Sequence, residues 1–331
     1  MKVAPWIVLF VILAILPFEF PSFRVEQFGS WMTLAIAACG LNLLTGYNGQ
    51  ISVGHGALFG IGAYTTGILI TEFGVPLFVA SAAAAVVCFF IGLLIGLPAL
   101  RIKGLYLALV TLAVATLFPL LIEQFSSITG GSGGLQITSP QLYRGEMRER
   151  PIRLESPFAG LENDQWKYFL FLGVTVLVFV LSRNLIKSRV GRSLVAVRDN
   201  EVAAESSGIP ISRVKILTFG LSAAIAGIGG SLFALDQGQL YPSSFTIVLS
   251  VYILVAVVVG GAASIIGPAI GAAFYGLFSD VLVQQMPDRI QPARAVILGV
   301  LLIVLMLLAP GGVAGGFRSL QTKWVARKQL S

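Results

Sequence analysis

The sequence lacks the charge that a soluble protein carries. Only 11% of its 331 residues are Asp, Glu, Lys or Arg, whereas a soluble domain carries about 25%. The mean hydropathy is +0.89, and apolar runs of about 20 residues, the length of a transmembrane helix, recur along almost the whole chain. A soluble protein with a large core would need buried helices without polar faces throughout. We therefore predict a polytopic, all-α membrane helix bundle.

Histidine and cysteine are also scarce. The chain has one histidine, His55, and two cysteines, Cys39 and Cys88, both inside apolar runs. This set contains no metal-binding spacing, so we predict no metal site and expect both cysteines to be small buried residues. A membrane enzyme needs a nucleophile, metal ligands or paired acids at depth, and a proton relay through His55 needs an acidic partner there. The sequence offers neither, so we predict no catalytic residue.

The apolar runs predict ten membrane segments. The first resembles a signal peptide, but no small-residue cleavage site follows it, so we interpret it as a retained helix. Glycine and polar residues crowd the turns at 46–56 and 259–268, and either turn could be a re-entrant bend. The predicted segments are 4–18, 29–46, 55–72, 76–97, 104–123, 167–185, 213–235, 245–261, 266–285 and 293–310.

The positive charges lie mostly on one side of this arrangement. With the N-terminus in the cytoplasm, the inner side receives fourteen of the 22 Lys and Arg residues and three of the 15 Asp and Glu residues. An excess of Lys and Arg in cytoplasmic loops is the usual pattern in membrane proteins, so we place both termini in the cytoplasm. Anionic lipid of the inner leaflet accounts for the pI of 9.6, and no nucleic acid partner is expected.

Two loops are long enough to have roles of their own. Residues 125–167 form an outer loop that opens with a glycine-rich run and continues with mixed charge. Residues 187–215 form an inner loop that is basic at its ends and acidic in the middle. We treat 1–316 as one membrane domain that carries both loops, and 317–331 as a basic cytoplasmic tail.

Residues 41–62 interrupt an apolar run with amides, hydroxyls, the histidine and a row of glycines. Polar or irregular backbone at membrane depth persists only where it is buried in protein or lines a wet cavity. This segment therefore predicts a substrate path, lined or gated by Asn42, Thr45, Asn48, Gln50, Ser52 and His55.

Two other interpretations of this segment stay open. Small and polar residues also hold transmembrane helices together, which is the interpretation we favour for Gly54, Gly56, Gly60 and Gly62. Three of the polar candidates could instead lie in a solvated turn at the inner surface, namely Asn48, Gln50 and His55.

The inner loop contains the start and stop signals of a short helix. Asp199 or Asn200 can cap the helix through a side-chain oxygen, and Glu201 then lies in the first turn, where the helix dipole favours a negative charge. Gly208 is placed as a left-handed C-terminal cap, and Pro210 prevents further winding.

The surface of this short helix favours a protein contact. A helix that lies on lipid carries bulky apolar groups along one face, yet Val202 is the only sizeable apolar side chain between 199 and 207. We expect Ala203 and Ala204 to present a flat surface that another protein can approach closely.

Several motifs resemble one known family. RDNEVAAESSGI (198–209) resembles the Glu-Ala-Ala loop of ABC-importer permeases, which docks into a cleft of the cytoplasmic ATPase. The segment GLNLLTGYNGQISVGHGALFGIGAYT resembles the permeases for branched-chain amino acids, specifically the LivM type. Further matches keep the order of that family and cover most of the chain, namely LRIKGLYLALVTLA, TGGSGGL, VGRSLVAVRDNEVAAESSGI and GGAASIIGPAIGA.

This resemblance implies partners in a bacterial inner membrane. They are a second, LivH-type permease subunit, two ABC ATPase subunits below, a periplasmic substrate-binding protein above, and the lipid bilayer. The sequence contains no Gly-Lys dipeptide and hence no P-loop, so ATP and Mg²⁺ would be bound by the partner ATPases and this chain would hold no cofactor. The residues expected to couple to the ATPases are Arg198, Asp199, Asn200, Glu201, Ala203, Ala204 and Gly208.

The resemblance further implies inward transport of branched-chain or related apolar amino acids. Composition alone makes the glycine run after Thr129 a plain turn, whereas the resemblance favours an outer hinge formed by Gly130, Gly131, Gly133 and Gly134. An importer of urea, short amides or small aromatic acids is the alternative within the class. An ion-coupled secondary carrier is disfavoured, because it predicts ionisable residues near the midplane and no docking loop.

Overall fold

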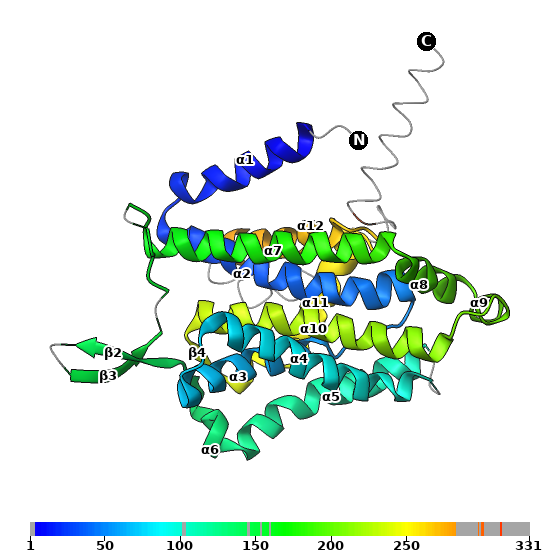
Figure 1. The fold of residues 1–331 in the computed structure, drawn as a ribbon, viewed down its shortest axis with the longest axis horizontal. Helices are drawn as coiled ribbons and strands as arrows, with labels where there is room; N and C mark the ends of the chain where they lie inside the picture. Colours follow the sequence, from blue (N-terminus) through cyan, green and yellow to red (C-terminus); the bar gives the residue numbers. More distant parts are fainter. Residues whose placement is uncertain are drawn as a thin grey trace, which may run out of the picture.

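The computed structural model describes residues 4–100, 104–143, 146–152, 154–158 and 160–282, together with residues 297, 299, 300 and 312. Most of these residues lie in helices whose axes run roughly along one direction (Figure 1). The predicted segment 293–310 falls almost entirely outside the described residues, and the tail 317–331 falls wholly outside them.

Each of the first nine predicted segments overlaps a helix of the described chain. Within the described residues, six helices are long and apolar enough to cross a membrane, which confirms a helical membrane bundle. These six are α2 (Ser22–Leu41) with its extension η1 (Asn42–Tyr47), α3 (His55–Phe73), α4 (Leu77–Gly96), α5 (Leu105–Gln124), α7 (Asn163–Lys187) and α10 (Ile211–Gln237). The shorter apolar helices are α1 (Ala4–Glu19), α11 (Ile247–Gly260), and α12 (Gly267–Gly276) with η5 (Leu277–Leu282).

Helix α10 lies inside the bundle and packs against α2, α3 and α4. Glycines allow this close approach, as they do in many transmembrane helix pairs. A Cβ on Gly230 would collide with the Phe59 carbonyl of α3, and one on Gly62 would collide with the backbone of Gly227. Cβ atoms on Gly54, Gly56 and Gly60 would likewise collide with α5 or α11 side chains or backbone. The packing role predicted for these glycines of the 41–62 segment is therefore confirmed.

The helices differ in which environment they face. In the most apolar window of α2 and η1, 72% of the residues are buried, whereas only 22% are buried in α4 and in α7. Most of the exposed side chains of α4 and α7 are themselves apolar, for example Phe90, Leu94, Leu177 and Leu181. An apolar surface of this kind is stable only against lipid or another apolar subunit.

The two long loops lie at opposite ends of the bundle, as predicted. Helices α8 (Arg189–Asp199) and α9 (Glu201–Ser206) are at one end, and a hairpin of β2 (Thr138–Tyr143) and β3 (Glu146–Pro151) projects from the other (Figure 1). These strands are absent from the all-α prediction. A second strand pair joins β1 (Leu135–Gln136) to β4 (Gln239–Leu240) in antiparallel register. The remaining short elements are η2 (Pro98–Leu100), α6 (Ser126–Thr129), η3 (Gly131–Gly133) and η4 (Pro242–Phe245).

Candidate functional site

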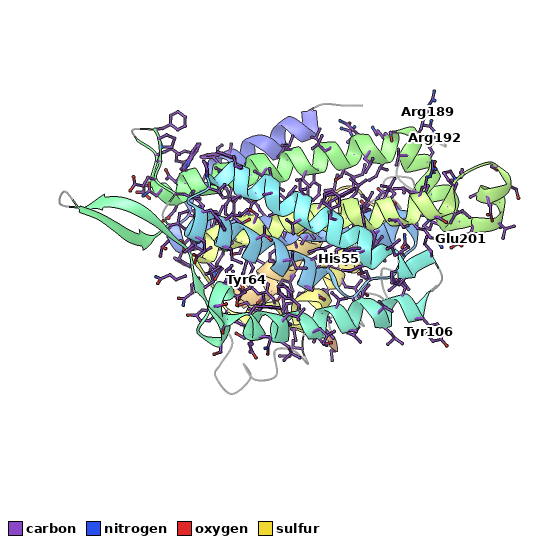
Figure 2. The ribbon with its side chains drawn as sticks, turned by 60° about the horizontal axis from the view of Figure 1, so that its bottom comes forward. His55, Tyr64, Tyr106, Arg189, Arg192 and Glu201 are labelled. Atoms are coloured by element: carbon purple, nitrogen blue, oxygen red, sulfur yellow. The ribbon has the colours of Figure 1, made fainter. Side chains whose placement is uncertain are left out.

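His55 begins α3 and lies deep in the bundle (Figure 2), where it is fully buried. The Ser222 hydroxyl of α10 donates to the Gly40 carbonyl at 2.6 Å, so its oxygen accepts from His55 Nε2 at 2.7 Å. His55 Nδ1 is then free to accept the Ser52 hydroxyl at 3.0 Å. Both ring nitrogens are thus satisfied in a neutral imidazole. His55 of α3 thus contacts α10 directly and is linked to α2 through the Ser222 hydroxyl.

Hydroxyl groups of neighbouring helices cap the buried start of α3. The first N–H groups of a helix have no partner within it and must be satisfied elsewhere. One of these groups, the Gly56 N–H, donates to Ser250 Oγ of α11 at 2.9 Å, and the Val53 N–H just before the helix donates to Thr111 Oγ1 of α5 at 2.9 Å. Sequence reasoning did not select these hydroxyls, because each lies in an otherwise ordinary apolar run.

Asn42 connects η1 to the turn between α11 and α12. Its Nδ2 donates to the Ser264 carbonyl at 2.8 Å, and its Oδ1 accepts the Ala263 N–H at 2.9 Å. Ala263 has a φ of +58°, a left-handed conformation that is costly for a residue with a Cβ. The Asn42 amide therefore holds the second glycine-rich turn in a strained conformation.

The turn at 46–54 contains amide groups that lack partners. The Thr45 hydroxyl donates to the Gln50 carbonyl at 3.0 Å, and Gln50 Nε2 donates to the Lys215 carbonyl of α10 at 3.3 Å. Asn48 is only 3% exposed, yet neither its Nδ2 nor its Oδ1 hydrogen-bonds to any group of the described chain. Gln50 Oε1 is also buried without a hydrogen-bond partner there. Each unsatisfied buried group costs about 1–3 kcal/mol.

The structure thus divides the six path candidates. Asn42 and His55 hydrogen-bond to distant segments of the bundle, whereas Ser52 and Thr45 bond locally, Ser52 to the His55 ring and Thr45 to the Gln50 carbonyl. Only Asn48 and Gln50 keep polar atoms that nothing in the described chain satisfies.

The inner loop folds as its start and stop signals predict. Asn200 has extended backbone and its Oδ1 accepts the Ala203 N–H at 3.1 Å, so Asn200 is the cap. At the other end, the Ile209 N–H donates to the Ala204 carbonyl at 3.0 Å across Gly208, whose φ is +79°. This is a Schellman-type ending, in which glycine supplies the left-handed residue.

One detail of the predicted docking surface is wrong. Ala203 is exposed, but Ala204 is only 4% exposed and therefore faces the protein. A helix of six residues exposes only part of its circumference when it packs at the end of a bundle, and spacing alone does not show which part. The exposed side of α9 carries Val202, Ala203 and Glu205, and Val202 is 73% exposed.

Two basic residues connect this loop to the rest of the bundle. Lys215 Nζ lies 2.6 Å from Glu201 Oε1, and the Lys215 side chain is only 6% exposed. Arg198 donates twice to Asp199 Oδ1, at 2.8 and 2.9 Å, and donates from Nη1 to the Gly46 carbonyl at 3.0 Å. Sequence reasoning counted Lys215 only as a cytoplasmic charge, because nothing in the local pattern pairs it with Glu201.

The glycine-rich run at the opposite end forms an ordered turn. The Thr129 hydroxyl donates to the Ile122 carbonyl at 2.6 Å and Gly130 ends α6 in a left-handed conformation with a φ of +76°. A Cβ on Gly134 would come 2.7 Å from the Leu240 carbonyl, whereas one on Gly133 would meet nothing within 4 Å. Gly131 is buried. The hinge role of these four glycines remains a prediction.

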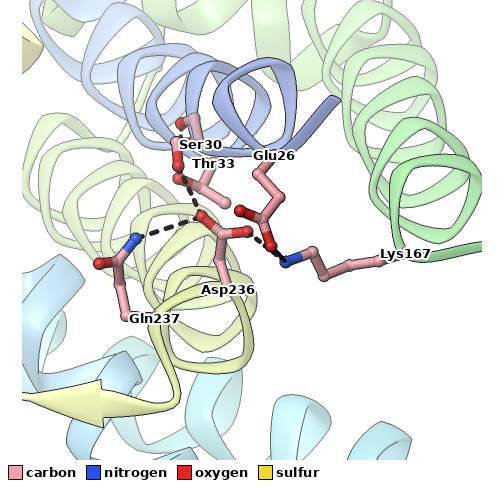
Figure 3. Close-up of polar contacts among 6 residues, drawn as sticks. All are labelled: Glu26, Ser30, Thr33, Lys167, Asp236 and Gln237. Carbon is pink, nitrogen blue, oxygen red and sulfur yellow. Dashed lines mark hydrogen bonds and ion pairs between the residues drawn. The ribbon is translucent and has the colours of Figure 1, made fainter. Parts of the chain in front are cut away.

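Charged residues join α2, α7 and α10 at that end (Figure 3). Lys167 Nζ lies 3.1 Å from Asp236 Oδ1 and 3.3 Å from Glu26 Oε1, while Ser30 Oγ donates to Asp236 Oδ2 at 2.5 Å. Asp236 Oδ1 receives no hydrogen bond of good geometry from the described residues, so its contact with Lys167 is a simple ion pair. A cavity of about 450 Å³ opens beside this cluster and also reaches Asp280.

Neither cysteine forms a disulfide, and both are buried, as predicted. No group of three or more His, Cys, Asp or Glu residues in the described parts of the chain could hold a metal ion.

Comparison with known proteins identifies the family. A family model described as branched-chain amino acid transport system / permease component matches residues 25–306. The chain is 32% identical to the high-affinity branched-chain amino acid transport system permease protein LivM of Salmonella typhimurium, over 92% of this chain and 73% of that protein. It is also 32% identical to LivM of Escherichia coli, over 85% of this chain and 68% of that protein.

A LivH permease protein of Escherichia coli is a more distant relative. The identity is 26%, over 86% of this chain and 91% of LivH. No solved structure matches the chain. Since the family model covers most of the sequence and the LivM proteins match over more than two thirds of their own length, the chain belongs to the family of branched-chain amino acid permease components and is of the LivM type.

Proposed function

We propose that this protein is the permease subunit of an ATP-driven importer that carries branched-chain amino acids into the cytoplasm. The observation that carries the proposal is the family match over residues 25–306, on a bundle whose spanning helices expose apolar faces. Two relatives that are 32% identical to this chain are named as branched-chain amino acid permeases. Recognition would rest mainly with a periplasmic binding protein, so the path itself needs only mild selectivity.

The proposed assembly contains two ABC ATPases and a second, LivH-type permease. Helices α8 and α9 would face the cytoplasm, because the inner loop is rich in Lys and Arg. The ATPases would bind ATP and Mg²⁺ and would meet the exposed side of α9. The hairpin end would then face the periplasm and the binding protein. This orientation places ten segments in the bacterial inner membrane and both termini in the cytoplasm.

The substrate path is proposed to pass the turn at 46–54. Asn48 supports this assignment, because its two unsatisfied amide atoms could hydrogen-bond a zwitterion once the turn opens. Asn42 and His55 would act beside the path by holding the segments that border it, and Ser52 would orient the His55 ring.

Import by the complete reconstituted complex tests the proposal. The complex with its ATPases, LivH-type permease and binding protein should accumulate leucine in proteoliposomes when ATP is present on the side of the membrane that carries the ATPases. Urea and small aromatic acids, offered with the same binding protein, should not accumulate. Accumulation of urea or an aromatic acid in place of leucine would assign the complex to another substrate class. Accumulation driven by an ion gradient without ATP would overturn the proposal.

A further inference from the structure

Lys215 occupies an unusual position in α10. Its side chain is only 6% exposed, and its ammonium lies 2.6 Å from the Glu201 carboxylate on α9. A buried ammonium is stable only while its counter-charge stays in place. Helix α9 therefore cannot move away from α10 unless Lys215 follows it or the ion pair breaks.

The same residue also contacts the turn at 46–54. The Lys215 carbonyl accepts from Gln50 Nε2 at 3.3 Å, so one residue of α10 contacts α9 through its side chain and the turn through its backbone. Arg198 makes a parallel connection by donating to the Gly46 carbonyl at 3.0 Å. A Cβ on Gly49 would come 2.8 Å from Arg198 Cγ, so the turn packs directly against the Arg198 side chain.

The turn at 46–54 contains buried polar atoms that lack hydrogen-bond partners in this conformation. Both amide atoms of Asn48 and the Oε1 of Gln50 are buried without a partner in the described chain. Buried polar groups are almost always bonded in a stable arrangement, so such groups require an explanation. The explanation is a second position of the turn, in which these atoms form hydrogen bonds to substrate or to a neighbouring subunit. Two such positions would make the turn a two-state element that a small displacement can bias.

We propose that Lys215, Gln50 and Arg198 are the positioning residues that couple α9 to the turn at 46–54. Displacement of α9 by the ATPases moves Lys215 through the Glu201 ion pair and moves the turn through Gln50 and Arg198. The turn then moves from the position in which the amide atoms of Asn48 and Gln50 lack hydrogen-bond partners to a position in which they have them. This movement opens or closes the path. This inference rests on the proposed function, because it needs ATPases that dock on α9.

The ratio of substrate imported to ATP hydrolysed tests this coupling. In the complete reconstituted complex, Lys215→Met removes the buried charge and Gln50→Met removes the donor to the Lys215 carbonyl. ATP hydrolysis stimulated by the binding protein should continue in both variants, while the transport ratio falls roughly tenfold, the size of a moderate coupling between two sites. Arg213→Met is the matched control, since Arg213 is an exposed cation two residues from Lys215, and its ratio should equal that of the wild type.

Gln50→Met also covers the case in which Lys215→Met does not assemble, since it leaves the ion pair intact. An unchanged ratio in Gln50→Met, whether import and hydrolysis both persist or both fall in proportion, would overturn the coupling proposal. A double exchange, Glu201→Lys with Lys215→Glu, should recover part of the ratio. If the wild-type complex imports no leucine at all, the proposed function fails instead, and the two failures are thereby distinguished.

Discussion

At the scale of single residues, Asn42 and His55 of the 41–62 segment use their polar atoms in hydrogen bonds to distant parts of the chain. Asn42 satisfies the Ala263 N–H and the Ser264 carbonyl, more than 200 positions away in the sequence. His55 is satisfied on both ring nitrogens by Ser52 and Ser222. These contacts explain why amides and a histidine persist in an apolar run, since each polar group at depth must find a partner.

Asn42→Leu should destabilise the protein. The substitution leaves the Ala263 N–H and the Ser264 carbonyl unsatisfied, which costs about 1–3 kcal/mol. The measurement is the thermal unfolding midpoint of the purified protein in detergent. Thr116→Val is the control, because the Thr116 hydroxyl is exposed and, among the described residues, donates only to the Ala113 carbonyl of its own helix. Equal midpoints for the two variants would show that Asn42 does not hold the second turn.

The sequence predicted the presence of these polar residues near the inner end but not their partners. Ser222 and Lys215 lie in α10, far along the chain from His55 and Gln50. A contact between distant segments leaves no periodic pattern in the sequence. The same reason explains the error at Ala204, whose burial depends on how α9 packs and not on its own spacing.

At the scale of helices and strands, the bounds of an apolar run predict closely where a helix begins and ends. The segment predicted at 55–72 is α3 (His55–Phe73), and the one predicted at 76–97 is α4 (Leu77–Gly96). The six-residue extension η1 is π-helical, and the apolar pattern does not distinguish a π turn from an α turn. The two-residue strands β1 and β4 were not predicted either, because they pair across an intervening stretch of about a hundred residues and show no local pattern.

Two glycine substitutions should have opposite effects on stability. Gly230→Ala places a Cβ against the Phe59 carbonyl and separates α10 from α3, and overpacking of this kind costs about 1–3 kcal/mol. In Gly173→Ala the new Cβ meets nothing within 4 Å, so higher helix propensity should stabilise α7 by up to about 1 kcal/mol. Thermal unfolding of both variants in detergent gives the sign directly. A stabilised Gly230→Ala protein would contradict the close packing of α10 and α3.

The cap of α9 should matter for binding the ATPases. Asn200→Ala removes the acceptor of the Ala203 N–H, and loss of such a cap costs about 0.5–2 kcal/mol. A helix of six residues has few other contacts with which to compensate, so the dissociation constant of the permease–ATPase complex should rise. Asn200→Asp keeps an acceptor at the same place and should bind as the wild type does. Equal loss of binding in both variants would show that the amide itself, and not the cap, is required.

At the scale of the whole molecule, composition predicts a membrane bundle but not its layers. Helix α4 is more apolar than α2 with η1, yet a larger share of α2 with η1 is buried. The reason is that lipid is as apolar as a protein interior, so lipid-facing helices need no polar side. The inner helices are recognised instead by their small residues, such as Gly227, Gly229 and Gly230 in α10, which allow close packing.

The arrangement of the loops makes the orientation of the whole molecule testable. Helix α9 and the segment after β3 lie at opposite ends (Figure 1), and each offers an exposed position, Val202 and Glu155. Cysteines introduced singly at these positions, in a Cys39→Ala and Cys88→Ala background, report on opposite sides of the membrane. Both native cysteines are buried, so replacing them should not disturb either surface.

A membrane-impermeant thiol reagent should label Glu155→Cys in intact spheroplasts and should label Val202→Cys only after the membrane is opened. The physical basis is the excess of Lys and Arg around α8 and α9, which resists translocation and keeps that end in the cytoplasm. The cysteine-free protein is the control for background labelling. The reverse pattern would place α9 in the periplasm, out of reach of any ATPase, and would overturn both the proposed orientation and the docking role of α9.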